Sequence, residues 1–222
     1  MVAAPARRLR WPAQATVPAE YGAALAQRNA ALRRVAAGFS SREALRPWTE
    51  SIAALGARLV AARRDIIKTL EPAFAARAGE LGLGGALLRY DGQPPTSEAL
   101  EARLERDLDR GATGIGPHLD DVGIFAADRD LRAFGSQGEQ RLAVLALLLA
   151  EAELVQERRG YPPLLLLDDV LSELDPERRR VLAERIRGFR QALITTTTAA
   201  ALPVEPDQLL EVEAGASGTV VR

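Results

Sequence analysis

Two neighbouring stretches decide the fold of this chain: SQGEQRLAVLALLLAEAELVQ at residues 136–156 and LLLLDDVLSELD at residues 164–175. The first predicts a glycine-containing turn that opens a long apolar helix. The second predicts a strand buried in a parallel sheet, because a continuous apolar run is typical of such strands. Its two aspartates then lie at the carboxyl end of a strand, where open α/β sheets bind ligands. Alternatively, the two acids only end the strand and cap the next helix.

Composition narrows the class of protein. The chain has 222 residues, 47% of them hydrophobic, which suffices for one domain with an insertion or for two small domains. The net charge is −1, so any contact with nucleic acid must come from local arginine patches. There is no cysteine, which excludes disulfides and thiolate metal sites. No apolar run suits a membrane span or a signal peptide, so we expect a soluble, cytoplasmic protein with no membrane partner.

Lysine content bears directly on nucleotide binding. Lys68 is the single lysine, and every other basic residue is arginine. The phosphate-binding loop G-x-x-x-x-G-K-[ST] requires a lysine after its second glycine. Lys68 lies in DIIKTL, without those glycines, so the sequence contains no such loop. We therefore expect a segment outside this sequence to grip the phosphates of any bound nucleotide.

The first half of the chain predicts a helical arm. One helix is expected from Pro18 to about Ala37, since proline is favoured at a first helical position. A second starts near Pro47, and its apolar residues alternate at spacings typical of a coiled-coil seam or of an ordinary bundle helix. Pro72 is expected to kink or end it. A short strand within 79–90 and a charged helix over 98–110, capped by Ser97, complete this half.

The second half predicts an α/β domain. Strands are expected at 122–126 and 131–134, joined by a turn. They are followed by a helix at 137–158, a strand at 164–168, a helix at 176–187, a strand from Gln191 and a closing hairpin. The predicted elements change near residue 110 from mainly helices to alternating strands and helices. We therefore predict a helical domain over 1–110 and an α/β domain over 111–222.

The turn before the long helix has the features of an anion site. Ser136 followed by Glu139 is a capping box, and Gly135 and Gly138 let the backbone approach a ligand closely. Free N–H groups and the positive end of the helix dipole favour an anion there. A capped helix without a ligand explains the same residues. Further on, Asp175 precedes a proline that starts another helix.

Taken in order, these elements resemble the carboxyl-terminal half of an ABC-type ATPase head, and more narrowly the RecF family of recombination-repair ATPases related to SMC proteins. The stretches that carry the resemblance are TGIGPHLDDVGIF, AFGSQGEQRLAVLALLLAEAEL, PPLLLLDDVLSELDPERRRVL and QALITTTT. PAEYGAALAQRNAALRR and LRPWTESIAALGARLVAARR resemble the helical arm of that family more loosely. In the family the phosphate-binding loop lies in an amino-terminal portion, which this sequence lacks.

The resemblance implies roles for particular residues. Asp168 would hold Mg²⁺ through water, because magnesium keeps much of its hydration shell, and Asp169 would orient or deprotonate an attacking water. Asp175 would lie in the loop that couples two subunits. The remaining nucleotide contacts would be a signature that meets ATP held by a partner protomer (Ser136, Gln137, Gly138, Glu139) and a strand end near the γ-phosphate (Thr196, Thr197). The implied cofactors are ATP and Mg²⁺.

The resemblance also implies partners. RecF proteins bind duplex DNA near single-strand gaps, work with RecO and RecR, and form an ATP-dependent homodimer. The arginine pairs at 33–34 and 63–64 are candidates for phosphate contacts, although solvated helix faces explain them equally. Leu119 departs from the family, which usually has arginine there. The only histidine, His118, is expected to be a structural, hydrogen-bonded residue rather than a metal ligand.

Three functions stay open at this point. The first is a RecF-like replication and repair protein without the phosphate-binding lobe, which we expect to be inactive as an ATPase on its own. A second reading is a non-catalytic module that docks on the ATP of an intact RecF-type partner. A third is an inert, truncated fragment.

Overall fold

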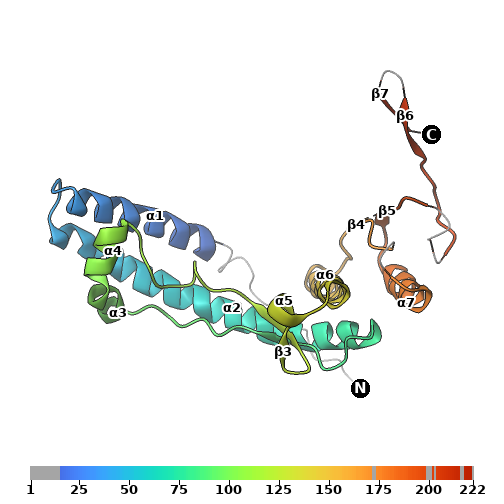
Figure 1. Cartoon of the computed structure of the whole chain (residues 1–222), viewed down its shortest axis with the longest axis horizontal. Coiled ribbons are helices and arrows are strands. Elements are labelled where there is room, and N and C mark those ends of the chain that lie inside the picture. Colours follow the sequence, from blue (N-terminus) through green and yellow to red (C-terminus); the bar gives the residue numbers. More distant parts are fainter. Residues whose placement is uncertain (1–15, 172–173, 199–201, 203, 216–217, 222) are drawn as a thin grey trace.

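The structure is a computed structural model that describes residues 16–171, 174–198, 202, 204–215 and 218–221. The described chain is elongated, with a helical arm at one end and a helix-and-sheet body at the other (Figure 1). Helix α1 (Val17–Ala36) runs beside helix α2 (Arg46–Glu80) in the arm, and the short helix η1 (Arg42–Leu45) connects them. The predicted arm is thus a helical hairpin in which α2 is the longer member.

Helix α1 matches the helix expected from Pro18. Proline stands in its first turn, and the backbone leaves the helix at Gly38, whose φ of 76° lies in the left-handed region that glycine adopts without steric cost. Tyr21 and Leu32 are both buried on the side facing the rest of the arm. Local sequence signals therefore suffice to define this helix.

Helix α2 does not end at Pro72. It continues through the proline to Glu80, although proline lacks the N–H that an interior position donates. The residues on either side are held by packing: Leu70, Phe74 and Ala78 are 4%, 0% and 0% exposed in the larger core. Burial of this apolar stripe outweighs the local cost of the proline, so of the two predicted outcomes at Pro72, a kink or an end, the end does not occur.

A small antiparallel sheet lies against the second half of α2. Strand β2 (Gly123–Ala126) pairs with β1 (Leu87–Arg89) on one side and with β3 (Arg129–Asp130) on the other. The strand expected at 131–134 is instead the short helix α5 (Leu131–Phe134). Its cause is local, because the Asp130 carboxylate accepts a hydrogen bond from the Arg132 N–H and starts a helical turn.

The charged helix expected over 98–110 is two helices, α3 (Ser97–Ala102) and α4 (Leu104–Arg110). The N-cap is Thr96, whose hydroxyl accepts from the Ala99 N–H at 3.1 Å, and not the expected Ser97. Leu100 of α3 and Asp107 of α4 are both fully buried in the arm. Each helix thus fixes one side chain in the arm, and the chain turns between them at Arg103.

The body contains a parallel pair of strands, β4 (Leu165–Asp168) and β5 (Ala192–Thr195), which confirms the predicted parallel strand. Helices α6 (Gln137–Arg159) and α7 (Pro176–Ile186) lie on the same side of this pair (Figure 1). The hairpin expected at the end of the chain is β6 (Val212–Gly215) with β7 (Gly218–Val221). The predicted helices and strands after residue 136 therefore occur in the expected order.

Two hydrophobic clusters hold these elements together. The smaller lies in the arm between α1, α2 and α3 and includes Tyr21, Ile52 and Leu100. The larger joins the second half of α2 to β1, α6, β4 and α7, and includes Phe74 and Leu149. Because α2 and β1 contribute to this second cluster, residues before 110 pack with residues after it. The domain division at residue 110 stays a prediction.

Candidate nucleotide-binding edge

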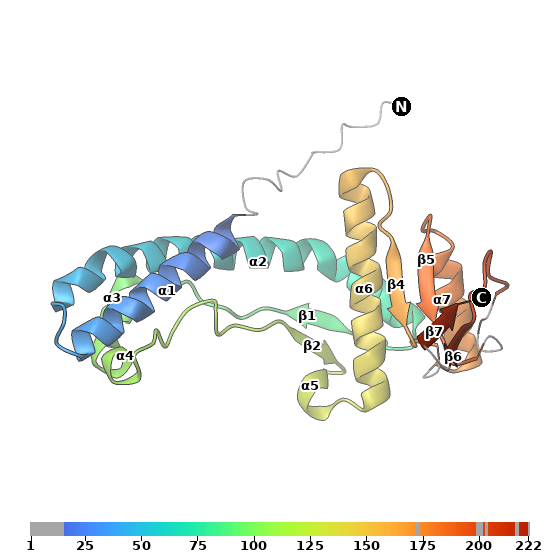
Figure 2. The ribbon, with the colours of Figure 1, turned by 90° about the horizontal axis from the view of Figure 1, so that it is seen from above.

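One edge of the β4–β5 pair gathers the residues singled out in the sequence. Helices α6 and α7 run antiparallel to the strands that follow them, so the amino ends of both helices lie on the same side as the carboxyl ends of both strands (Figure 2). The strand ends at Asp168 and Thr195, and the helix starts at Ser136 and Asp175, share that edge as a result. We call this side the nucleotide edge.

Thr195 joins the two aspartates at the strand end. Asp168 and Thr195 are partners in the β4–β5 register, and the Thr195 hydroxyl donates a hydrogen bond to the Asp168 carboxylate. The same hydroxyl oxygen accepts from the Asp169 N–H at 3.0 Å. Asp169 has a φ of 48°, a left-handed conformation that aspartate tolerates better than most residues. Asp168 and Asp169 are both exposed at the edge.

The sequence predicts no role for Thr195; it indicates Thr196 and Thr197 as the residues of this strand end. Thr197 is exposed, and the Thr196 hydroxyl donates to the Thr198 carbonyl at 3.2 Å. The hydrogen bonds to the aspartates within the described residues come from Thr195 instead. Strand register decides this difference, because β5 side chains alternate and Thr195 is the residue opposite Asp168. The roles of Thr196 and Thr197 stay predictions.

The amino end of α6 has the predicted capping box. Glu139 N–H donates to Ser136 Oγ at 3.2 Å, and Ser136 N–H donates back to Glu139 Oε2 at 2.8 Å. These bonds from Ser136, with a smaller effect of Arg129, lower the pKa of Glu139. Gln137 and Gly138 are exposed, and a Cβ added to Gly138 would meet no atom closer than 4.0 Å. The helix end is thus fixed by its own capping-box hydrogen bonds, and it has open space beside Gly138.

Asp175 starts α7 as its N-cap. Its Oδ1 accepts from the Arg178 N–H at 2.9 Å, and its Oδ2 lies 3.0 Å from Arg178 Nη1. Arg178 also donates from Nε to the Leu81 carbonyl at 2.9 Å, which ties α7 to the end of α2. Ser172 and Glu173, in the loop before Asp175, lie outside the described residues. The helix entry is confirmed, and the coupling role of Asp175 stays a prediction.

Known proteins with similar sequences show the family of this chain. The DNA replication and repair protein RecF of Geobacter sulfurreducens is 42% identical over 201 residues, which cover 84% of this chain and 54% of that protein. RecF of Myxococcus xanthus is 36% identical over 209 residues, which cover 85% of this chain and 54% of that protein. This chain is homologous to the carboxyl-terminal portion of RecF-family proteins. It spans about half the length of the curated relatives that it matches. No protein-family model matches the chain.

Solved RecF structures agree with the observed fold. One such structure is that of RecF with ATP, described as the recombination mediator protein of the RecFOR pathway. It matches 88% of this chain with a TM-score of 0.74 and 28% sequence identity. The match covers 55% of that RecF chain. The fold is therefore the carboxyl-terminal half of an ABC-type ATPase head with a preceding helical arm, as the sequence predicted.

Oxygen donors at the RecF-like edge fit a nucleotide-bound Mg²⁺. Magnesium keeps several waters and takes only one or two carboxylates besides the phosphates. Asp168 supplies an exposed carboxylate, and Thr195 holds it in place by a hydrogen bond. Within the described residues there is no group of three or more His, Asp or Glu side chains arranged to hold a metal ion without a ligand. The oxygens of Asp168 and Thr195 are thus of the kind that Mg²⁺ prefers.

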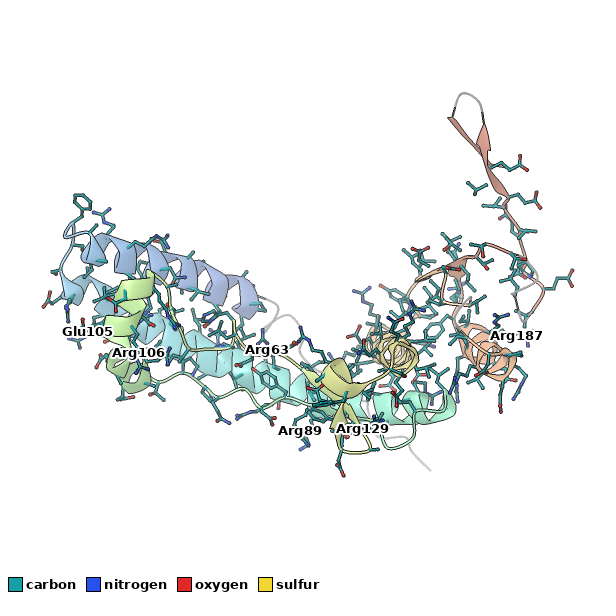
Figure 3. The ribbon with its side chains drawn as sticks, viewed as in Figure 1. Arg63, Arg89, Glu105, Arg106, Arg129 and Arg187 are labelled. Atoms are coloured by element: carbon teal, nitrogen blue, oxygen red, sulfur yellow. The ribbon has the colours of Figure 1, made fainter. Side chains whose placement is uncertain are left out.

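Three of the four arm arginines considered for DNA contacts are engaged with backbone carbonyls. Arg33 donates to Gly111 O at 3.3 Å, and Arg64 donates to Gly92 O at 2.7 Å. Arg63 donates to the carbonyl of Pro117 and lies over the Tyr90 ring (Figure 3). Arg34 is exposed and makes no such bond among the described residues. A DNA role for these four side chains stays a prediction.

His118 is a hydrogen-bonded structural residue, as expected. Its Nε2 lies 3.0 Å from the Thr113 carbonyl, so this nitrogen must carry the proton and donate. Its Nδ1 then accepts from the Tyr21 hydroxyl at 2.8 Å. Nearby Leu119, where the family resemblance led us to expect arginine, is 63% exposed. Among the helices of the described chain, none is both long enough and apolar enough to traverse a bilayer.

Proposed function

We propose that this chain serves in DNA replication and repair as the carboxyl-terminal part of a RecF-type ATPase. The observation that supports this most is the nucleotide edge, where Asp168, Asp169 and Thr195 are joined beside the capped end of α6 in a chain 42% identical to RecF. ATP and Mg²⁺ are the proposed ligands, since RecF has been solved with ATP. DNA, RecO, RecR and a second protomer are the proposed partners, and the cytoplasm is the proposed compartment.

Each residue of the edge has a proposed role. Asp168 holds Mg²⁺, partly through water, with Thr195 fixing the orientation of its carboxylate. Asp169 orients or deprotonates the attacking water, and its backbone is fixed by two hydrogen bonds to Thr195. A bound Mg²⁺ would neutralise charge on the phosphates in the transition state.

The amino end of α6 meets ATP from a second protomer in this proposal. Ser136 and Glu139 use their side chains within the capping box, so the anion is met by backbone N–H groups and by exposed Gln137. Gly138 leaves open space on the outer side of the helix end. Asp175 lies on the same edge and transmits the state of the site, and Thr196 and Thr197 lie near the γ-phosphate.

In this mechanism the phosphates of ATP are bound by a segment outside this sequence. The 222 residues include no G-x-x-x-x-G-K-[ST] loop, and positioning of the phosphates is the main source of catalysis in phosphoryl transfer. We therefore expect negligible ATP hydrolysis by this chain alone. The test is hydrolysis of radiolabelled ATP by the purified chain. Turnover that Asp169→Asn abolishes, while Asp109→Asn on exposed α4 leaves it intact, would contradict the proposal.

A specific observation favours a second role, as a module that docks on an intact RecF-type partner. One face of the β4–β5 pair is uncovered: Leu164, Leu166 and Leu193 are 53%, 65% and 56% exposed. Parallel strands are normally covered on both faces, so this leucine face is suited to a second layer of protein. The same exposed face would promote aggregation if the chain were an inert fragment.

Pull-down with intact RecF separates these possibilities. A docking module binds intact RecF more tightly with ATP than without it, because the α6 end meets the partner's nucleotide. Leu166→Glu/Leu193→Glu removes an ATP-independent part of the binding, whereas Gly138→Ala removes the ATP-dependent part. No association, or association that ATP leaves unchanged, counts against the module. A broad thermal transition with aggregation would support the inert fragment instead.

A further inference from the structure

Unpaired arginines collect on the side of the β4–β5 pair opposite the nucleotide edge. Arg159 is the last residue of α6, Arg187 is the C-cap of α7, and Arg190 lies just before β5. All three are exposed. Within the described part of the chain, none of them has a hydrogen-bond or ion-pair partner. We call these three side chains the basic rim.

Topology brings the basic rim together from two separate segments. The carboxyl ends of α6 and α7 and the amino ends of β4 and β5 lie on one side of the body (Figure 2). The connection after α6 meets the connection after α7 where the Leu165 N–H donates to the Gln191 carbonyl at 3.1 Å. Figure 3 marks Arg187 at α7, the helix farthest from the arm. The three arginines thus lie on the side of the body opposite the nucleotide edge.

Charge on the basic rim is not balanced locally. The segments 157–159 and 184–190 contain five arginines and two glutamates. Glu184 is engaged by Arg180, and Arg185 is engaged by Glu80 of α2. Glu157 is then the only carboxylate of these two segments without a partner, against the three arginines of the rim. These two segments therefore carry more positive than negative charge.

Helix dipoles explain only part of this pattern. Arginine in a last helical turn stabilises a helix through its interaction with the helix dipole, which accounts for Arg159. Arg190 lies beyond α7, after a turn in which Phe189 N–H donates to Ile186 O at 2.9 Å, so it serves no helix end. Its exposure next to the other two arginines therefore has no structural explanation within the described chain.

Other exposed arginines lie in a different charge environment. Arg42, Arg46 and Arg58 are each paired with a glutamate. Arg106 and Arg110 have no ion-pair partner among the described residues, but α3 and α4 also carry the exposed acids Glu98, Glu101 and Asp109 (Figure 3 labels Arg106). The basic rim thus combines free guanidinium groups with a local surplus of positive charge.

We propose that the basic rim binds the phosphate backbone of DNA. A guanidinium presents a fork of N–H donors that matches two phosphate oxygens, and exposed arginines bind phosphate without a preformed pocket. Tyr161, 56% exposed in the connection after α6, offers a ring on which an unpaired base stacks. That ring favours nucleic acid over an acidic protein. The choice of DNA rests on the proposed repair function, and the choice of surface rests on the geometry alone.

Fluorescence anisotropy of labelled single-stranded and duplex DNA over a range of salt concentrations tests this proposal. Arg159→Gln/Arg187→Gln/Arg190→Gln should lower the salt dependence, the slope of log K against log [salt], by about 2–3 for duplex DNA. Its matched control, Arg42→Gln/Arg46→Gln/Arg58→Gln, removes the same formal charge from paired arginines and should leave the slope unchanged. No nucleotide is present, so the result is independent of the ATP proposal.

The outcomes separate cleanly. Equal loss of binding in the rim variant and in its control, or no DNA binding by the parent chain, overturns the proposal. Loss of binding in Arg34→Gln/Arg106→Gln/Arg110→Gln, with the rim variant unaffected, assigns the DNA contact to the arm and overturns it as well. Thermal unfolding checks that each variant folds. If the triple rim variant is unfolded, Arg190→Gln alone, outside any helix, should lower the slope by about 1.

Discussion

The backbone N–H of Asp169 lies 3.0 Å from Thr195 Oγ1, across two strands that are parallel neighbours. The same hydroxyl donates to Asp168, so one threonine orders both acids of the nucleotide edge. A hydroxyl that donates and accepts at once has a fixed rotamer, and it fixes the carboxylate with it. This arrangement orders the edge before any nucleotide arrives.

Replacing Thr195 with valine should therefore destabilise the chain, although the site is exposed. The side-chain shape is kept and two hydrogen bonds are lost, so we expect a decrease of about 1–2 kcal/mol in the free energy of unfolding. Denaturant unfolding measures it. Thr197→Val is the matched control, because Thr197 is exposed and contacts neither aspartate. A similar decrease in both variants would show that Thr195 has no special role.

Gly138→Ala should separate stability from function. Alanine in place of a helical glycine stabilises a helix by roughly 0.5–1 kcal/mol, and a Cβ here meets no close neighbour. If the helix end receives a ligand, the same methyl group should weaken ATP-dependent association with intact RecF. Gly22→Ala in α1 is the control, since it also meets open space and lies far from the edge. Equal behaviour of the two variants in the pull-down would contradict a ligand at Gly138.

The buried ion pair of the arm should be far more sensitive than its surface pairs. Arg28 Nη1 lies 2.9 Å from Asp107 Oδ2, both side chains are 0% exposed, and Thr113 Oγ1 accepts from the same Nη1 at 2.7 Å. Asp107→Asn leaves a buried guanidinium uncompensated, and we expect a loss of about 3–5 kcal/mol. Arg46→Gln, at the exposed pair with Glu50, should cost less than about 1 kcal/mol. Thermal or denaturant unfolding compares them, and equal losses would mean that the buried pair has been misjudged.

Alkaline pH should loosen the arm through Tyr21. Burial raises the pKa of Tyr21 from its ordinary 10.0 to about 12. The folded chain then keeps a proton that the unfolded chain releases. The contribution of Tyr21 to stability is complete below pH of about 10 and is lost as the pH rises towards about 12. Unfolding measured across this range should show a shallower decline for Tyr21→Phe than for the parent.

Tyr161→Phe is the control for that experiment, because its ring is 56% exposed. Burial, with the hydrogen bond to Asp120, also raises the pKa of Tyr90, so a residual decline should persist in Tyr21→Phe. An unchanged decline in Tyr21→Phe would show that the Tyr21 hydroxyl ionises alike in the folded and unfolded chains.

Local signals were enough to predict much of the body. The Ser136–Glu139 capping box and the Asp175–Pro176 helix entry each lie within a few consecutive residues, and both occur as expected. The order of helix, strand, helix and strand also occurs as expected. Capping and apolar spacing are properties of neighbouring residues, so the sequence alone determined them.

Tertiary structure decided the rest. Packing carries α2 through Pro72, strand register selects Thr195 rather than its neighbours, and carbonyls distant in sequence engage Arg33, Arg63 and Arg64. The basic rim also exists only because β5 pairs with β4. These features join residues tens of positions apart. Their free energy depends on which surfaces meet in the folded chain, and that information is not contained in any short stretch of sequence.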